Sequence, residues 1–151
     1  MSAPIPALRF AGYAALFDRV DRGGDVVRRG AFARAVERGG AHVPLLWQHD
    51  PARPIGRIET LAEDARGLRV IARLTPGNRA ADEAAALLRD GAVGGLSFGY
   101  RTRKVRAAGR GRELTDLDLV EVSLVTLPMQ PGARVHAIAD EQSPFLNRQG
   151  E

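Results

Sequence analysis

Residues 43–74 read VPLLWQHDPARPIGRIETLAEDARGLRVIARL and contain three strand patterns in succession. The first, VPLLWQH, is an apolar run too short for a typical helix, and Asp50-Pro51 ends it. This pattern predicts a buried strand with His49 at its end. Two more strands are predicted at Ile55–Leu61 and Leu68–Leu74.

The rest of the chain adds more strands and two helices. Strand patterns cover Ala7–Phe17, Val93–Val105 and Leu114–Leu127, and helical patterns cover Gly30–Arg38 and Arg79–Arg89. The polar, glycine-rich Arg106–Arg112 is typical of a loop. Because strands and helices do not alternate regularly, we expect a mostly β domain of the α+β class. It should form a compact, mainly antiparallel β-barrel, closed or nearly closed, with about two flanking helices.

The length and composition fit one domain with one hydrophobic core. We expect the domain to span residues 1–139, and residues 140–151 to form a mobile tail because they have little that could pack. The chain contains no cysteine, which excludes disulfides, thiolate nucleophiles and cysteine-based zinc sites. No apolar run approaches the ~20 residues that cross a bilayer, and no signal peptide is apparent, so we expect a cytoplasmic protein without membrane contact.

The net charge of +4 comes almost entirely from arginine, since Lys104 is the only lysine. The arginines are spread over every segment among Asp and Glu, without the aromatic partners of a single-strand binding groove. This spread favours a solvated surface. Specific nucleic-acid binding is not expected, although a basic nucleic-acid-binding module stays as a minor alternative.

Two residues stand out as candidates for chemistry. Among the histidines at 42, 49 and 136, His49 follows an apolar strand, where a loop can hold a general base on a rigid frame. Ser97 lies in GGLSFG, residues 94–99, whose glycines permit unusual dihedrals and close approach of a substrate backbone.

The same stretch matches G-x-S-x-G, the nucleophile elbow of hydrolases with a parallel sheet. An acid, Asp116 or Asp118, and His136 follow Ser97 in the required order. The elbow needs a helix directly after the serine, however, and FGYRTRKV continues as a strand, which disfavours this alternative. No pattern of metal ligands or phosphate-binding glycines occurs either, and no cofactor is expected.

Four motifs occur in order along the chain: GYAALFDRVDRGGDVVRRGAF, LLWQHDPARPIGR, GAVGGLSFGYRTR and DLVEVSLVTLPMQPGA. Together they resemble a known family, the prohead maturation proteases of phages of the HK97 type, which also serve phage-like gene transfer agents. The resemblance implies a fold similar to the herpesvirus assemblins, a β-barrel ringed by helices. It also implies that serine and histidine come from separate strands, which we expect to be adjacent.

By this resemblance His49 matches the catalytic histidine and Ser97 the nucleophile, and the third triad member lies on the strand after the serine. Glu121 is the best candidate, with Asp118 and Asp116 as rivals. A carboxylate there would hold the imidazole in the required tautomer and stabilise its charged form.

Strand alternation places Glu121 and Ser123 on one face and Val120, Val122 and Leu124 on the other. Glu121 therefore points either to solvent or to a site. Ser123 shares its face and is expected to support it by hydrogen bonding.

The resemblance implies a serine endopeptidase that removes the scaffolding segment of the major capsid protein, and trims its own ends, inside the immature capsid in the host cell. The major capsid protein would be the partner and substrate, and the assemblin analogy suggests a homodimer. The alternative is a catalytically silent capsid-assembly or scaffold protein with the same fold.

Overall fold

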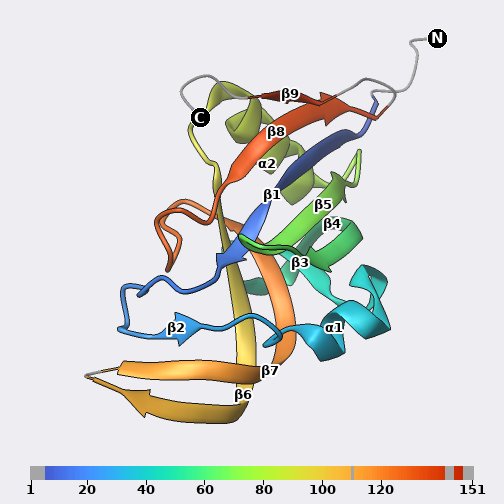
Figure 1. The fold of residues 1–151 in the computed structure, drawn as a ribbon. Helices are drawn as coiled ribbons and strands as arrows, with labels where there is room; N and C mark the ends of the chain where they lie inside the picture. The colour runs from blue at the N-terminus through green and yellow to red at the C-terminus, as the bar shows by residue number, and fades with distance from the viewer. Residues whose placement is uncertain (1–5, 110, 142–144, 148–151) are drawn as a thin grey trace, which may run out of the picture.

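The computed structural model describes residues 6–109, 111–141 and 145–147. In chain order its elements are β1 (Leu8–Leu16), β2 (Val26–Val27), α1 (Ala33–Arg38), the 3₁₀ turn η1 (Gly40–His42), β3 (Pro44–Trp47), β4 (Asp50–Glu63), β5 (Gly67–Leu74), α2 (Arg79–Asp90), β6 (Gly95–Ala108), β7 (Gly111–Val125), β8 (Val135–Asp140) and β9 (Leu146–Asn147). This content confirms the mostly β, α+β class (Figure 1).

All described strands belong to one sheet, in the order β2-β7-β3-β4-β5-β1-β8-β9, with β6 paired to β7. The pairings of β2 and β3 with β7 are parallel, and the others are antiparallel. The ladder does not close into a continuous barrel. A single bridge between Gly95 and Arg134, with a 2.8 Å hydrogen bond from Leu96 N to Ala133 O, connects β6 to the segment before β8.

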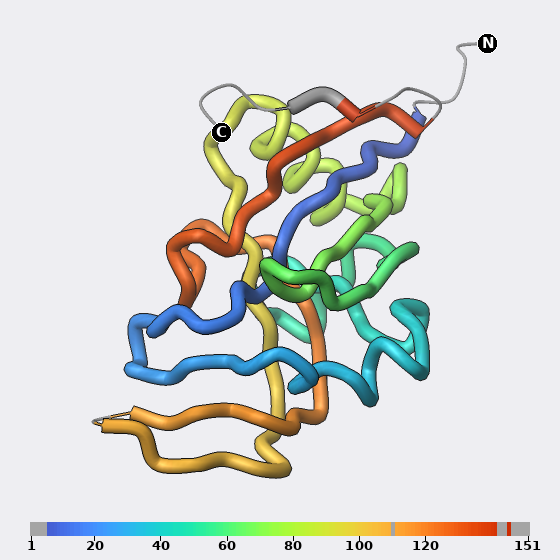
Figure 2. Tube along the Cα trace, viewed as in Figure 1, coloured from blue at the N-terminus to red at the C-terminus, as the bar shows by residue number. Residues whose placement is uncertain are grey.

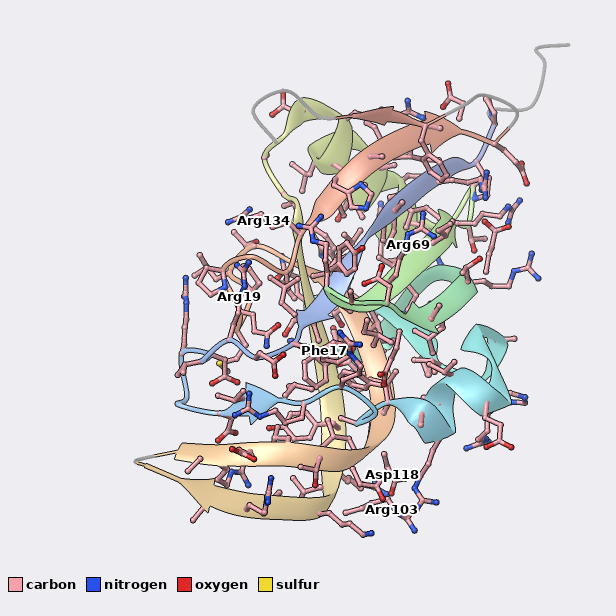
Figure 3. All side chains as sticks on the ribbon, viewed as in Figure 1. Phe17, Arg19, Arg69, Arg103, Asp118 and Arg134 are labelled. Carbon is pink, nitrogen blue, oxygen red and sulfur yellow. The ribbon has the colours of Figure 1, made fainter. Side chains whose placement is uncertain are left out.

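The predicted loop at residues 106–112 is wrong, because β6 and β7 continue through most of it as a long hairpin arm (Figure 2). Opposite charges across the two strands support the arm. Arg106 contacts Glu113 at 2.9 Å, and Arg103 contacts Asp118 at 3.1 Å (Figure 3). The polar composition that favoured a loop is that of a solvated two-stranded ribbon.

Helix α2 confirms the helix predicted at Arg79–Arg89. The Asn78 side chain caps its first turn by accepting a 2.9 Å hydrogen bond from Ala81 N. Gly91 ends the helix in the left-handed conformation, with a φ of 83°. Helix α2 buries Ala84 and Leu88 against the core. Of the helices in the described ranges, none is long and apolar enough to span a membrane.

The C-terminal segment differs from the expected mobile tail. Residues 142–144 and 148–151 lie outside the described residues, but residues 146–147 pair with β8 as β9. The guanidinium of Arg9 also lies over the Phe145 ring, 5.1 Å from its centroid. Part of this segment therefore packs on the sheet.

Candidate active site

Strand β7 carries the centre of the site, with β6 on one side of it and β3 on the other. Ser123 of β7 stands opposite Ser97 of β6 and is also in register with Leu46 of β3. Residues opposite each other in an antiparallel ladder have Cβ atoms about 4.5–5.5 Å apart, so Ser97 and Ser123 share one face. The expectation that the His49 and Ser97 strands are adjacent is wrong, because β3 pairs in parallel with β7, which separates them.

His49 lies in a tight turn directly after β3. Gln48 and His49 have φ angles of 52° and 60°, in the left-handed region that non-glycine residues rarely adopt. Gln48 N donates to Leu124 O at 2.9 Å, and His49 N donates to Ser123 Oγ at 3.1 Å. The Gln48 side chain also exchanges two hydrogen bonds with Thr126, of 2.8 and 3.1 Å. These contacts hold the turn against β7.

Glu121 has both carboxylate oxygens occupied. Oε1 pairs with Nδ1 of His49, and Oε2 accepts a 2.6 Å hydrogen bond from Ser123 Oγ. Glu121 and Ser123 are buried, whereas 45% of the imidazole is exposed. When Nδ1 donates its proton to Glu121, Nε2 is left as the ring nitrogen that can accept a proton.

The two rival carboxylates have other partners. Asp116 contacts Arg34 at 3.1 Å, and Asp118 contacts Arg103 at 3.1 Å. Hydrogen bonding from Arg34 holds the pKa of Asp116 below its ordinary value. Of the three carboxylates considered on β7, Glu121 is the one that contacts His49.

Gly99 faces Glu121 across the β6–β7 ladder. A Cβ atom at Gly99 would lie 2.7 Å from Oε1 of Glu121, well inside contact distance. The space beside this glycine, which we expected to admit a substrate backbone, is thus filled by the carboxylate. The sequence shows that a glycine follows Ser97 by two residues, but only the structure shows that this glycine leaves room for Glu121.

Val120 interrupts the alternation of β7. The ladder pairs Glu121 with Gly99 and Leu119 with Tyr100, which leaves Val120 as an extra, bulged residue. An extra residue changes which face the neighbouring side chains take. Val120 is accordingly 43% exposed, whereas Val122 is fully buried, so the expectation that these two valines share a face is wrong.

Ser97 is buried on β6, and this strand continues to Ala108 with no helix after the serine. The nucleophile-elbow alternative is therefore wrong. His136, which that alternative required, stacks on Tyr13 with ring centroids 5.9 Å apart. Within the described residues no hydrogen bond joins Ser97 to His49, and such bonds often form only when substrate is bound.

Comparisons with known proteins agree with this fold. The model of the family described as Caudovirus prohead serine protease matches residues 6–148. The prohead protease of Enterobacteria phage HK97 is 33% identical over 133 residues, covering 85% of this chain and 59% of the relative. A capsid polyprotein of Pseudomonas phage PAJU2 is 29% identical over 104 residues, covering 64% of this chain and 16% of the relative. The chain therefore spans less than two thirds of the length of these two relatives.

Solved structures of low sequence identity share the fold. The capsid assembly protease of bacteriophage T4 aligns with a TM-score of 0.61 and 18% identity, covering 80% of this chain and 83% of that protein. The KSHV protease, solved with a hexapeptide phosphonate inhibitor, aligns with a TM-score of 0.58 and 14% identity, covering 89% of this chain and 66% of that protein. The varicella-zoster virus protease aligns with a TM-score of 0.55 and 16% identity, covering 90% of this chain and 65% of that protein. The expected likeness to herpesvirus proteases is confirmed for the fold, and the chain belongs to the Caudovirus prohead serine protease family.

Proposed function

We propose that this chain is a serine endopeptidase in which Ser97 is the nucleophile, His49 the general base and Glu121 the group that orients His49. The observation that carries the proposal is the contact between His49 Nδ1 and Glu121 Oε1. It forms beside Ser123, which stands opposite Ser97. Family membership supports the same reaction class.

In the first half of the reaction, Ser97 Oγ attacks the carbonyl carbon of a peptide bond while its proton passes to Nε2 of His49. The ring then carries a positive charge, which the carboxylate of Glu121 stabilises through Nδ1–H. The carbon–nitrogen bond breaks, and Nε2 returns the proton to the departing amine. An ester between Ser97 and the acyl half of the substrate remains.

In the second half, a water molecule replaces the amine. His49 takes a proton from the water as its oxygen attacks the ester carbonyl, and the proton then returns to Ser97 Oγ as the ester bond breaks. The 45% exposure of the imidazole supports this step, because water can reach the ring. Glu121 holds the same tautomer throughout.

The substrate follows from the relatives. One relative is named a prohead protease, and a structural neighbour is named a capsid assembly protease. By this likeness the substrate is the scaffolding segment of the major capsid protein, cleaved inside the immature capsid, together with the chain's own ends. A homodimer is part of the proposal by analogy with the assemblins.

A fluorophosphonate probe, which forms a covalent bond with activated serines, tests the proposal. We expect labelling that peptide mapping locates at Ser97, and expect its loss in Ser97→Ala and His49→Gln. Ser123→Ala is the matched control, because it removes a neighbouring hydroxyl and keeps the nucleophile, so labelling should be slower but present. A folded wild-type chain without label at Ser97 would contradict the mechanism and favour the silent assembly protein.

A further inference from the structure

An apolar cavity of about 370 Å³ opens beside the imidazole of His49. Its lining combines His49 and Glu121 with residues that take no part in the reaction. These are the bulged Val120 and a group from β3 and the start of β4, namely Pro44, Leu46, Pro51 and Pro54. His49 and Glu121 are the only titratable groups in the lining.

The wall of this cavity is built for apolar contact. Leu46 is buried, while Pro44, Pro51 and Pro54 are exposed at the rim. Proline lacks a backbone N–H and has a fixed φ, so these positions offer no hydrogen-bond donor and little freedom to move. Such a wall recognises an aliphatic or aromatic side chain and does not compensate a buried polar group.

The cavity lies within reach of a substrate held at Ser97. Ser97, Ser123, Leu46 and Pro54 are register partners on four neighbouring strands. Strands lie ~4.8 Å apart, which puts Leu46 about 10 Å and Pro54 about 14 Å from Ser97. An extended peptide advances ~3.3 Å per residue, so three or four residues cover this distance.

A second copy of the chain is a poorer occupant than the substrate. The cavity includes His49 and Glu121, and a permanent partner seated there would cover the imidazole. A substrate side chain occupies the cavity only while the base is in use. The cavity is thus continuous with the reacting groups and open when they are free.

We propose that this cavity is a substrate subsite that takes an apolar side chain three or four residues from the scissile bond. The assignment rests on the proposed function. Val120 is the lining residue whose replacement probes the subsite most directly, because it is 43% exposed and its side chain is not needed for the core. Apolar pockets discriminate poorly between related side chains, and loss of a methylene costs about 10- to 200-fold.

To test the subsite, a proteome-derived peptide library is digested with the full chain, and the cleaved bonds are mapped by mass spectrometry. We expect Leu, Ile, Val, Met or Phe to be enriched at one position, three or four residues from the cleaved bond. In the best peptide, alanine at that position should lower kcat/KM about tenfold or more.

Charge variants then assign the preference to the cavity. Val120→Glu should shift the substrate residue preferred at that position toward Lys and Arg. Val120→Lys should shift this preference toward Asp and Glu. Val105→Glu is the matched control, since Val105 is also a 43% exposed valine in the β6–β7 ladder but lies on the hairpin arm. Its profile should equal the wild type. The profile is a ratio of rates, so a uniform loss of activity does not change it.

Each outcome has one meaning. Cleavage that depends on Ser97 but shows no apolar preference overturns the subsite and leaves the proposed function standing. The subsite is also overturned if the Val120 variants change the oligomeric state and not the profile. Absence of any Ser97-dependent cleavage, together with absence of fluorophosphonate labelling, overturns both.

Discussion

The carboxylate of Glu121 lies over Gly99, in the space that any larger residue at that position would fill with its side chain. Glycine at this point of β6 leaves room for the Glu121 carboxylate beside the strand, while Oε1 contacts His49. The second glycine of GLSFG thus serves the partner of the base, two residues from the proposed nucleophile.

Gly99→Ala should lower kcat/KM for a peptide substrate about 100-fold, because a displacement near 1 Å in a catalytic arrangement has roughly that cost. The new Cβ, 2.7 Å from Oε1, forces Glu121 to move. Gly23→Ala is the control, since a Cβ atom at Gly23 would lie 3.4 Å from its nearest neighbour, an oxygen of Asp21, which is ordinary contact distance. Full activity in a folded Gly99→Ala protein would show that the carboxylate position does not matter.

Glu121→Gln should lower kcat/KM by about 10²–10⁴, because an amide does not stabilise the imidazolium and can favour the wrong tautomer. Steady-state kinetics on one peptide measures the effect. Asp118→Asn should stay close to wild type, since Asp118 pairs with Arg103 on the hairpin arm. If the two variants behave in the opposite way, the orienting role belongs to Asp118.

Ser123→Ala should reduce kcat about tenfold and leave KM nearly unchanged. The hydroxyl donates to Glu121 and accepts from His49 N, so its loss frees both groups that position the imidazole. One such hydrogen bond contributes about 1–1.5 kcal/mol, which corresponds to this factor. A purely structural role would instead lower the unfolding temperature with kcat unaltered, so both are measured on the same preparation.

Asp25→Asn should lower the free energy of unfolding at pH 7 by about 1.5–3 kcal/mol, the usual range for hydrogen bonds to a charged group. Arg112 donates to both oxygens of Asp25, at 3.1 and 2.7 Å, and these bonds hold the pKa of Asp25 below its ordinary 3.8. Because the Arg112 guanidinium is half exposed to solvent, the loss of unfolding free energy should lie at the lower end of this range.

The effect of pH follows from the direction of that shift. A carboxyl whose pKa is lower in the folded state stabilises the protein above its unfolded pKa, and this stability is lost as pH falls through the folded pKa. Urea unfolding should therefore show the wild type and Asp25→Asn converging in acid below pH 3.8. Asp18→Asn, at a well-exposed ion pair, should show little difference at any pH. If the free energies of unfolding of the wild type and Asp25→Asn differ by the same amount at every pH, this account is wrong.

Several elements were predictable because their signals are local. Helix α2 has a capping Asn78, alanine and leucine through its length, and Gly91 at its end, and these determine a helix wherever the segment lies. The strand β8 was missed, although VHAIAD alternates and buries every second residue. The hairpin arm was missed because charged residues that pair across two strands have the same composition as a loop.

For the site, the sequence by itself determined which side chains are present: His49 after an apolar strand, Ser97 between glycines, and Glu121 on the last long strand. These follow from the order of residues and from short-range periodicity. Only the tertiary structure decided that β7 lies between β3 and β6, that Val120 is bulged, and that Gly99 makes room for Glu121. Each of these depends on which strand pairs with which and in what register, and pairing between distant segments is selected by packing of the whole core.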